Sequence, residues 1–130
     1  MGTSVRILDS PVCVEARYFG DVTPEDLITA LDGAFDLMRE HDVWLVLADT
    51  SELTSDPSVF ALYDVAAQIG DAGIARRFRE AVLAPVGSAS AESAAFFEDA
   101  IVNRGLIARV FTDRPTAEAW LVDQSRGLSA

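Results

Sequence analysis

The sequence Val43-Trp44-Leu45-Val46-Leu47-Ala48 is the longest apolar run in the chain. Six apolar residues without alternation are typical of a strand that is covered on both faces of a sheet. Helical spacing of apolar residues precedes this run directly, at Leu27, Leu31, Ala34, Phe35 and Met38. A covered strand beside an amphipathic helix predicts a sheet with helices packed against it.

The residues before this helix predict an antiparallel pair of strands. Apolar and polar residues alternate from Val12 to Phe19, and this period of two indicates a half-buried strand. A second apolar stretch, Val5 to Leu8, is separated from it by the turn signal Asp9-Ser10-Pro11. Because the connection is so short, we expect the two strands to form a hairpin.

Helix-start signals recur along the chain. Thr23-Pro24-Glu25-Asp26 combines a capping residue, a proline and two acids, and similar signals occur at Ser55-Asp56-Pro57, Ser88 to Ser90 and Asp113. Short apolar strands are expected between them, at 81–84 and 106–111. The resulting order predicts an α/β fold in one domain over residues 1–130. Its single mixed sheet combines an N-terminal antiparallel hairpin with parallel strands and is flanked by about four helices.

The chain is strongly acidic. Its 130 residues carry 21 acids against ten basic residues, for a formal charge of −11. The basic residues are all arginine, and 13 of the acids but only three arginines lie in residues 1–65. Such a surface disfavours nucleic acid and anionic membranes as partners.

Several features predict a protein of the cytoplasm without a cofactor. The longest apolar run is far shorter than the ~20 residues of a membrane span, and residues 1–6 contain no apolar leader segment. Cys13 is a single cysteine and His41 a single histidine, so neither an internal disulfide nor a zinc site is expected.

Catalytic motifs are not found in the sequence. A Ser-His-Asp arrangement would need His41, which lies between two acids at a predicted helix end, where a basic side chain suits the helix dipole. The G-x-S-x-G, P-loop and G-x-G-x-x-G patterns are missing. We therefore expect a protein that is not an enzyme. A cleft that grouped His41 with Asp49 or Asp56 would favour an enzyme instead.

The hydroxyl-rich segment Asp49–Ser58 is the strongest candidate for function, and we interpret it as a loop between a strand and a helix. Ser58 follows Pro57 in the expected first helical turn, where free backbone N–H groups favour an anion. Phosphorylation there would add a charge of about −1.5 to −2. The alternative is that Ser55 or Asp56 caps the helix and Ser58 has no role. Asp49, Thr50 and Ser51 are further candidates for contacts with a partner.

Two parts of the sequence resemble a known family. They are Asp49-Thr50-Ser51-Glu52-Leu53 and the ending Asn103 to Asp113 with Ala117-Glu118-Ala119-Trp120-Leu121. Together with the order and length of the elements, they resemble the SpoIIAA-like branch of the STAS and SEC14-like domains, and the likeness covers nearly the whole chain. The resemblance implies a mixed sheet flanked by helices and a bacterial binding module rather than a catalyst.

The resemblance also implies a partner and a switch. Anti-sigma factor antagonists of this superfamily bind an anti-sigma factor, a serine-kinase-like protein, and phosphorylation of a serine at a helix start releases them. Their motif is an aspartate, two serines and a glycine. Asp56 and Ser58 keep the aspartate-x-serine spacing, whereas Pro57 and Val59 replace the first serine and the glycine. Asp56 and Ser58 are therefore the predicted switch residues.

Two other interpretations stay open. The SEC14-like side of the resemblance implies a carrier of a small apolar ligand or lipid, held between helices and sheet. Its pocket would be lined by Phe60, Tyr63, Phe96 and Phe97. A homodimeric scaffold without a switch is the second interpretation, because fold alone does not determine function.

Overall fold

Five strands and four helices alternate along the chain. The computed structural model describes residues 2–74 and 77–129. The strands are β1 (Gly2–Asp9), β2 (Val12–Gly20), β3 (Leu45–Leu53), β4 (Arg79–Leu83) and β5 (Ile107–Phe111). The helices are α1 (Pro24–His41), α2 (Val59–Asp71), α3 (Ala91–Val102) and α4 (Arg114–Ser129).

The strands form one mixed sheet in the order β1-β2-β3-β4-β5. β1 pairs with β2 antiparallel, and every later pair is parallel. The predicted fold class, a mixed α/β sheet with an N-terminal hairpin and four helices, is confirmed. In the register of the three central strands, Val46 lies opposite Val14 on one side and Glu80 on the other. These three side chains therefore lie on the same face of the sheet.

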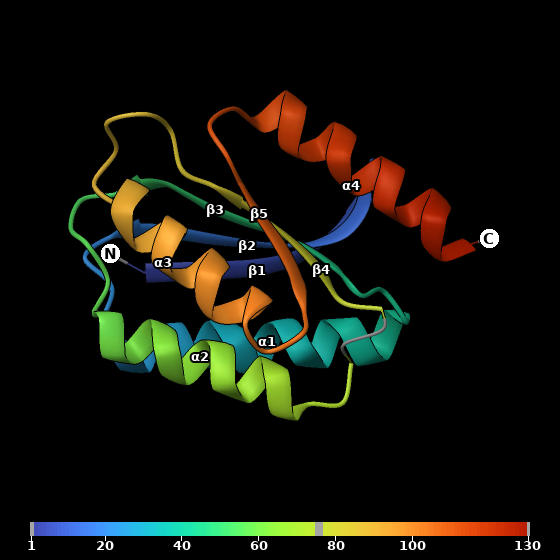
Figure 1. Cartoon of the computed structure of the whole chain (residues 1–130), viewed down its shortest axis with the longest axis horizontal. Helices are drawn as coiled ribbons and strands as arrows, with labels where there is room; N and C mark the ends of the chain where they lie inside the picture. Colours follow the sequence, from blue (N-terminus) through green and yellow to red (C-terminus); the bar gives the residue numbers. More distant parts are fainter. Residues whose placement is uncertain (1, 75–76, 130) are drawn as a thin grey trace.

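The two faces of the sheet are covered unequally. Figure 1 shows α1, α2 and α3 on one face and α4 alone on the other. The larger apolar core lies under the three helices, and the smaller one lies under α4 around Leu47, Phe111 and Leu121. Among the described residues, no helix is long and apolar enough to cross a membrane.

Local signals start the helices at α1 and α4 as expected. Thr23 accepts a hydrogen bond from the backbone of Asp26, and the Asp26 carboxylate accepts one from the backbone of Thr23, which makes a capping box. Asp113 accepts from the backbone N–H of Thr116 at 2.9 Å. Each of these signals lies within one helical turn, so the sequence alone is sufficient to predict it.

Two predicted boundaries around Asp49–Ser58 are wrong. β3 continues to Leu53, because Asp49, Glu52 and Leu53 pair in parallel with β2 across a shift in register, despite the polar side chains before Leu53. Only residues 54–58 connect the strand to α2. The helix begins at Val59 rather than at Pro57, and its N-cap is Ser58. Pro57 is buried against the core instead of opening the helix.

Candidate functional site

The carboxyl ends of β2 to β5 meet at one edge of the sheet, where ligands of open α/β sheets commonly bind. Near this edge, the Thr50 hydroxyl donates to the carbonyl of Leu83 at 2.7 Å and shares a hydrogen bond with the Ser90 hydroxyl at 2.8 Å. These contacts join β3 to β4 and to the N-cap of α3. Thr50 is therefore engaged inside the protein rather than free for a partner.

Asp49 lies within a polar network on the face under α4. Its carboxylate accepts from both the backbone N–H and the hydroxyl of Ser51, at 3.0 and 2.6 Å. The other oxygen of Asp49 lies 3.3 Å from the Arg114 guanidinium. Because Asp49 is buried and Ser51 is exposed, Ser51 is the member of this pair that faces solvent.

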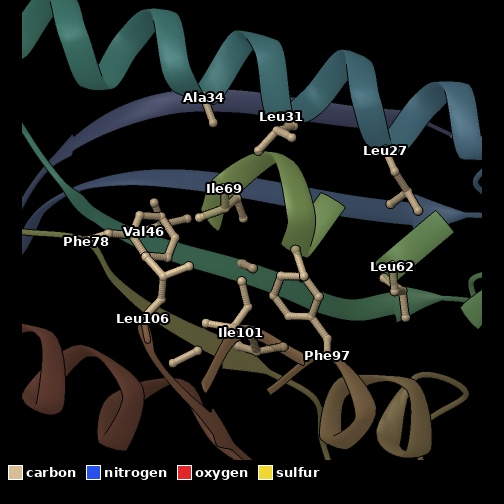
Figure 2. Close-up of a cluster of buried hydrophobic side chains, with 14 of the residues drawn as sticks. Leu27, Leu31, Ala34, Val46, Leu62, Ile69, Phe78, Phe97, Ile101 and Leu106 are labelled. Carbon is tan, nitrogen blue, oxygen red and sulfur yellow. The ribbon is translucent and has the colours of Figure 1, made fainter. Parts of the chain in front are cut away.

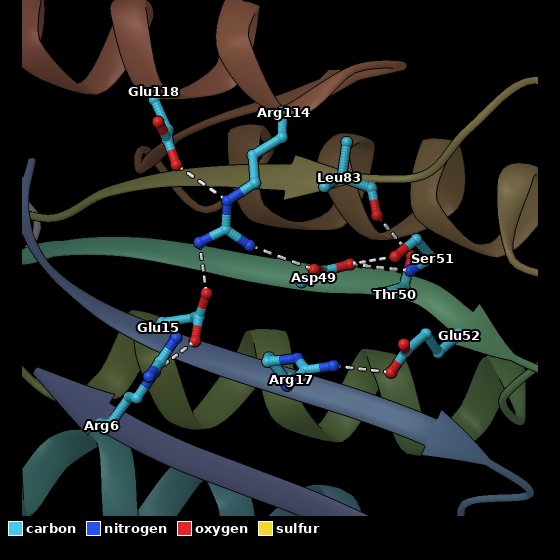
Figure 3. A network of polar contacts seen from close by, with 10 residues as sticks. All are labelled: Arg6, Glu15, Arg17, Asp49, Thr50, Ser51, Glu52, Leu83, Arg114 and Glu118. Atoms are coloured by element: carbon cyan, nitrogen blue, oxygen red, sulfur yellow. Dashed lines mark hydrogen bonds and ion pairs between the residues drawn. The ribbon is translucent and has the colours of Figure 1, made fainter. Parts of the chain in front are cut away.

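Arg114 is the centre of the polar network. It is the first residue of α4 and its guanidinium points down onto the sheet between Glu15 and Asp49 (Figure 3). It pairs with Glu15, with Asp49 and, at 2.8 Å, with Glu118 one turn later in α4. Arg6 on β1 pairs with the second oxygen of Glu15 at 2.7 Å. One arginine thus connects β2, β3 and α4.

The network stabilises a charge in the interior. Glu15 is only 1% exposed. Burial alone would raise the pKa of its carboxyl, but hydrogen bonds from Arg114 and Arg6 outweigh burial and hold that pKa below its usual value. Burial also opposes the charge on Arg114, yet its bonds to Glu15 and Glu118 raise its pKa. The arrangement keeps both partners charged and holds the start of α4 on the sheet.

The start of α2 presents a different kind of surface. Ser58 is exposed, and its hydroxyl accepts from the backbone N–H of Ala61 at 3.4 Å. The interpretation in which Ser55 or Asp56 caps this helix is therefore wrong, and Asp56 is an exposed residue just before it. Phe60 is 84% exposed and Tyr63 is 53% exposed. Residues at positions i and i+3 are neighbours on a helix, so these rings lie on the same side of α2.

A pocket lies in the larger apolar core, between the sheet and the helices α1, α2 and α3. Its volume is about 70 Å³, more than the ~10–15 Å³ that one water requires. Figure 2 shows the surrounding side chains converging from α1, α2, α3 and the sheet, with Phe97 among them. Phe97 lies in the pocket wall. Phe96 is partly buried against the core but is not in the pocket wall. Phe60 and Tyr63 are exposed. The expectation that Phe60, Tyr63 and Phe96 line the pocket is therefore wrong.

Glu80 is the unusual member of the pocket wall. It is the second residue of β4 and is 6% exposed. Within the part of the chain that the structure describes, its Oε1 atom has no hydrogen-bond partner. Burial raises the pKa of Glu80 to about 8, and burial together with Glu80 raises the pKa of Tyr18 in the same wall. At neutral pH, Glu80 is therefore mostly an uncharged carboxylic acid.

Glu15, Glu80 and Arg114 were not among the predicted site residues. A carboxylate inside an otherwise apolar strand is a usable signal for Glu15 and Glu80, since acids are rarely buried without a reason. For Arg114 there is no local signal, because its partners Glu15 and Asp49 are 99 and 65 positions away. Only the packing of α4 on the sheet shows what it binds.

His41 and the acids of the segment 49–58 lie apart in the fold. His41 is the last residue of α1, shortly before β3 begins, whereas Asp49 lies within β3 and Asp56 follows its carboxyl end. In the described ranges, 2–74 and 77–129, no group of three or more His, Cys, Asp or Glu side chains is placed to hold a metal ion.

Comparison with known proteins gives a structural likeness and no sequence match. No family model matches the chain, and no curated protein matches it significantly. The structure is similar to the crystal structure of an uncharacterized protein of the DUF3478 family with a SpoIIAA-like fold, from Shewanella loihica PV-4. The TM-score is 0.59 with 16% identity, over 92% of each chain. The chain therefore has a SpoIIAA-like fold, as its sequence predicted.

Proposed function

We propose that this chain is a non-catalytic regulatory module that binds a protein partner through the start of α2. The observation that carries the proposal is a surface made of Ser58, Phe60 and Tyr63, which we call the docking face. Two large exposed rings on one side of a helix are uncommon on a surface without a partner. The Arg104 guanidinium lies 4.9 Å from the centre of the Tyr63 ring and holds that ring in place.

The charge of the docking face indicates the chemistry of the partner. Asp56 precedes it and Asp64 follows it, both exposed, and the first half of the chain holds most of the acids. A complementary partner offers an apolar pocket for Phe60 with lysine or arginine around it. An anti-sigma factor or another serine-kinase-like protein is the partner that the SpoIIAA-like fold favours.

Ser58 is the proposed switch residue. Its hydroxyl is exposed at a helix N-terminus, where backbone N–H groups and the helix dipole accommodate an added phosphate. Phosphorylation would therefore leave α2 folded while adding a charge of about −1.5 to −2 to the docking face. Because a dianion is costly to desolvate beside Asp56, we expect the modification to release the partner.

The switch is tested by comparing Ser58→Asp with Ser58→Asn. Both residues are good N-caps, so the two variants differ in charge and not in helix stability. The partner is first captured by crosslinking in the native cells and identified by mass spectrometry. Its affinity for purified chains is then measured by calorimetry. We expect Ser58→Asp to bind about tenfold more weakly than Ser58→Asn, a difference of ~1.4 kcal/mol.

A second pair of variants tests the docking face itself. Phe60→Ala should weaken partner binding by tenfold or more, since exposed aromatic residues often dominate an interface. Val86→Ala removes another exposed apolar side chain, in the segment before α3, and should have little effect. Equal losses in both variants, or equal affinities for the two Ser58 variants, would contradict the proposed face or the proposed switch respectively.

The pocket favours a second candidate function, the binding of a small apolar ligand. Its wall is mostly apolar and it lies between the sheet and three helices. Binding of 1-hexanol or 1-butanol should raise the unfolding temperature of the native chain, because a ligand that binds only the folded state stabilises it. Ala94→Leu, which fills the pocket from α3, should abolish this rise. An alcohol effect of equal size in Ala94→Leu would place the binding elsewhere.

A further inference from the structure

Glu80 gives the pocket a chemical preference. Its Oε1 atom faces an apolar wall without a hydrogen-bond partner among the described residues. Leaving a buried polar atom unsatisfied costs on the order of 1–3 kcal/mol. A group of this kind in a native protein needs an explanation, and a ligand that supplies the missing donor is one.

The other polar groups in the wall are engaged or neutral. Thr50 and Ser90 bond to each other and to backbone carbonyls. Tyr18, from β2, is the other titratable side chain in the described wall. The residues that β3, α1, α2 and α3 contribute to it are apolar, apart from the hydroxyls of Thr50, Ser90 and Ser93. Within this wall, Glu80 is therefore the group able to take a negative charge near neutral pH.

We infer that the pocket binds a small molecule with an apolar body and one primary amine, whose ammonium group pairs with Glu80. This inference rests on the second candidate function, apolar ligand binding. The apolar walls accept the hydrocarbon, and the carboxylate is the counter-ion that a buried ammonium requires. The acidic surface also attracts a cation toward the chain. A ligand with a carboxylate would meet Glu80 as a like charge and is disfavoured.

Pairing with an amine requires Glu80 to lose its proton. A primary amine such as that of lysine stays protonated up to about pH 10. Below pH 8, complex formation therefore releases one proton from Glu80 into solution. Affinity for an amine should rise with pH, by up to about tenfold per unit while Glu80 is mostly neutral. An alcohol of the same length carries no charge, so its affinity should stay level between pH 6 and pH 7.

The test compares 1-butylamine and 1-hexylamine with the alcohols and carboxylates of the same chain length. Binding to the full native chain is followed by NMR titration of the pocket methyl groups of Leu31, Leu62 and Ile69, which separates binding in the pocket from binding at the acidic surface. We expect the amines to bind at least tenfold more tightly than the alcohols at pH 8. The affinity of the amines should increase at least tenfold between pH 6 and pH 8.

Glu80→Gln keeps the size of the side chain and removes its charge. It should weaken amine binding at pH 8 by tenfold or more and leave alcohol binding nearly unchanged, which also shows that the variant is folded. The matched control Glu92→Gln removes an exposed carboxyl of α3 and should leave both affinities unchanged. Amines that bind no better than alcohols, or equally well to Glu80→Gln, would overturn the inference while apolar binding survives. If neither amines nor alcohols bind, the second candidate function itself fails.

Discussion

Raising the pH from 5 to 8 is expected to lower the free energy of unfolding of the native chain far more than that of the Glu80→Gln variant. Burial raises the pKa of Glu80 from 4.5 to about 8 in the folded state. Between these values the folded chain holds one proton more than the unfolded chain, so its free energy of unfolding falls as pH rises. The contribution is complete below pH 4.5 and is lost as pH rises through 8. The slope approaches ~1.4 kcal/mol per pH unit, or on the order of 3–4 kcal/mol over this range.

The measurement is urea unfolding of both chains at several pH values. Glu80→Gln cannot titrate at this position, so the difference between the two curves isolates Glu80 from the general repulsion of an acidic chain. Glu92→Gln should follow the native curve. Parallel curves for the native chain and Glu80→Gln would mean that the Glu80 carboxyl is already charged in the folded protein, contrary to its apolar surroundings.

Arg114→Met is expected to lower the free energy of unfolding by about 3 kcal/mol. Removing one partner of a buried ion pair typically costs 3–5 kcal/mol, because a charge is left uncompensated. We take the lower end because about a third of the Arg114 side chain is exposed and Arg6 still reaches Glu15. The unfolding temperature should fall by roughly 10 °C.

Arg126→Met is the matched control on the same helix. Its pair with Asp123 has side chains that are 77% and 71% exposed, so we expect a change below ~0.5 kcal/mol. A similarly small effect for Arg114→Met would show that the network behaves as a surface ion pair. Acid should reduce the difference in stability between the native chain and Arg114→Met. Because the pKa of Glu15 is lowered, its contribution is present above pH 4.5 and is lost as pH falls through the folded-state value.

The elements of the fold could be predicted because their signals are local. The capping box at Thr23 spans a single helical turn, the alternation at Val12 to Phe19 lies within one strand, and the run Val43–Ala48 identifies a covered strand by itself. Strand–helix–strand steps then restrict the topology to parallel crossovers. This is enough to reach a mixed α/β sheet flanked by helices. The SpoIIAA-like fold was implied by the resemblance of residues 49–53 and of the ending from Asn103, and the structural likeness to the Shewanella loihica protein confirms it.

Strand and helix limits around Asp49–Ser58 were harder to predict. The polar residues 49–52 have the composition of a loop, but Asp49, Glu52 and Leu53 pair with β2. Pairing with a distant strand overrode local preference. The N-cap of α2 is Ser58 rather than Ser55 or Asp56, because Pro57 is buried against the core. Packing, and not the capping signal in the sequence, therefore determines where α2 begins.

The sequence alone was sufficient for the order of the elements, the acidic character of the chain and the candidate residues Asp56 and Ser58. Tertiary structure was required to place Phe60 and Tyr63 on the surface and Phe97 in a pocket wall. It was also required to bring Arg114 to Glu15, 99 positions away, and to enclose Glu80 among apolar side chains from five other elements. The physical reason is the range of each interaction: backbone propensity and capping act over a few residues, whereas burial and charge pairing depend on which distant segments the fold brings together.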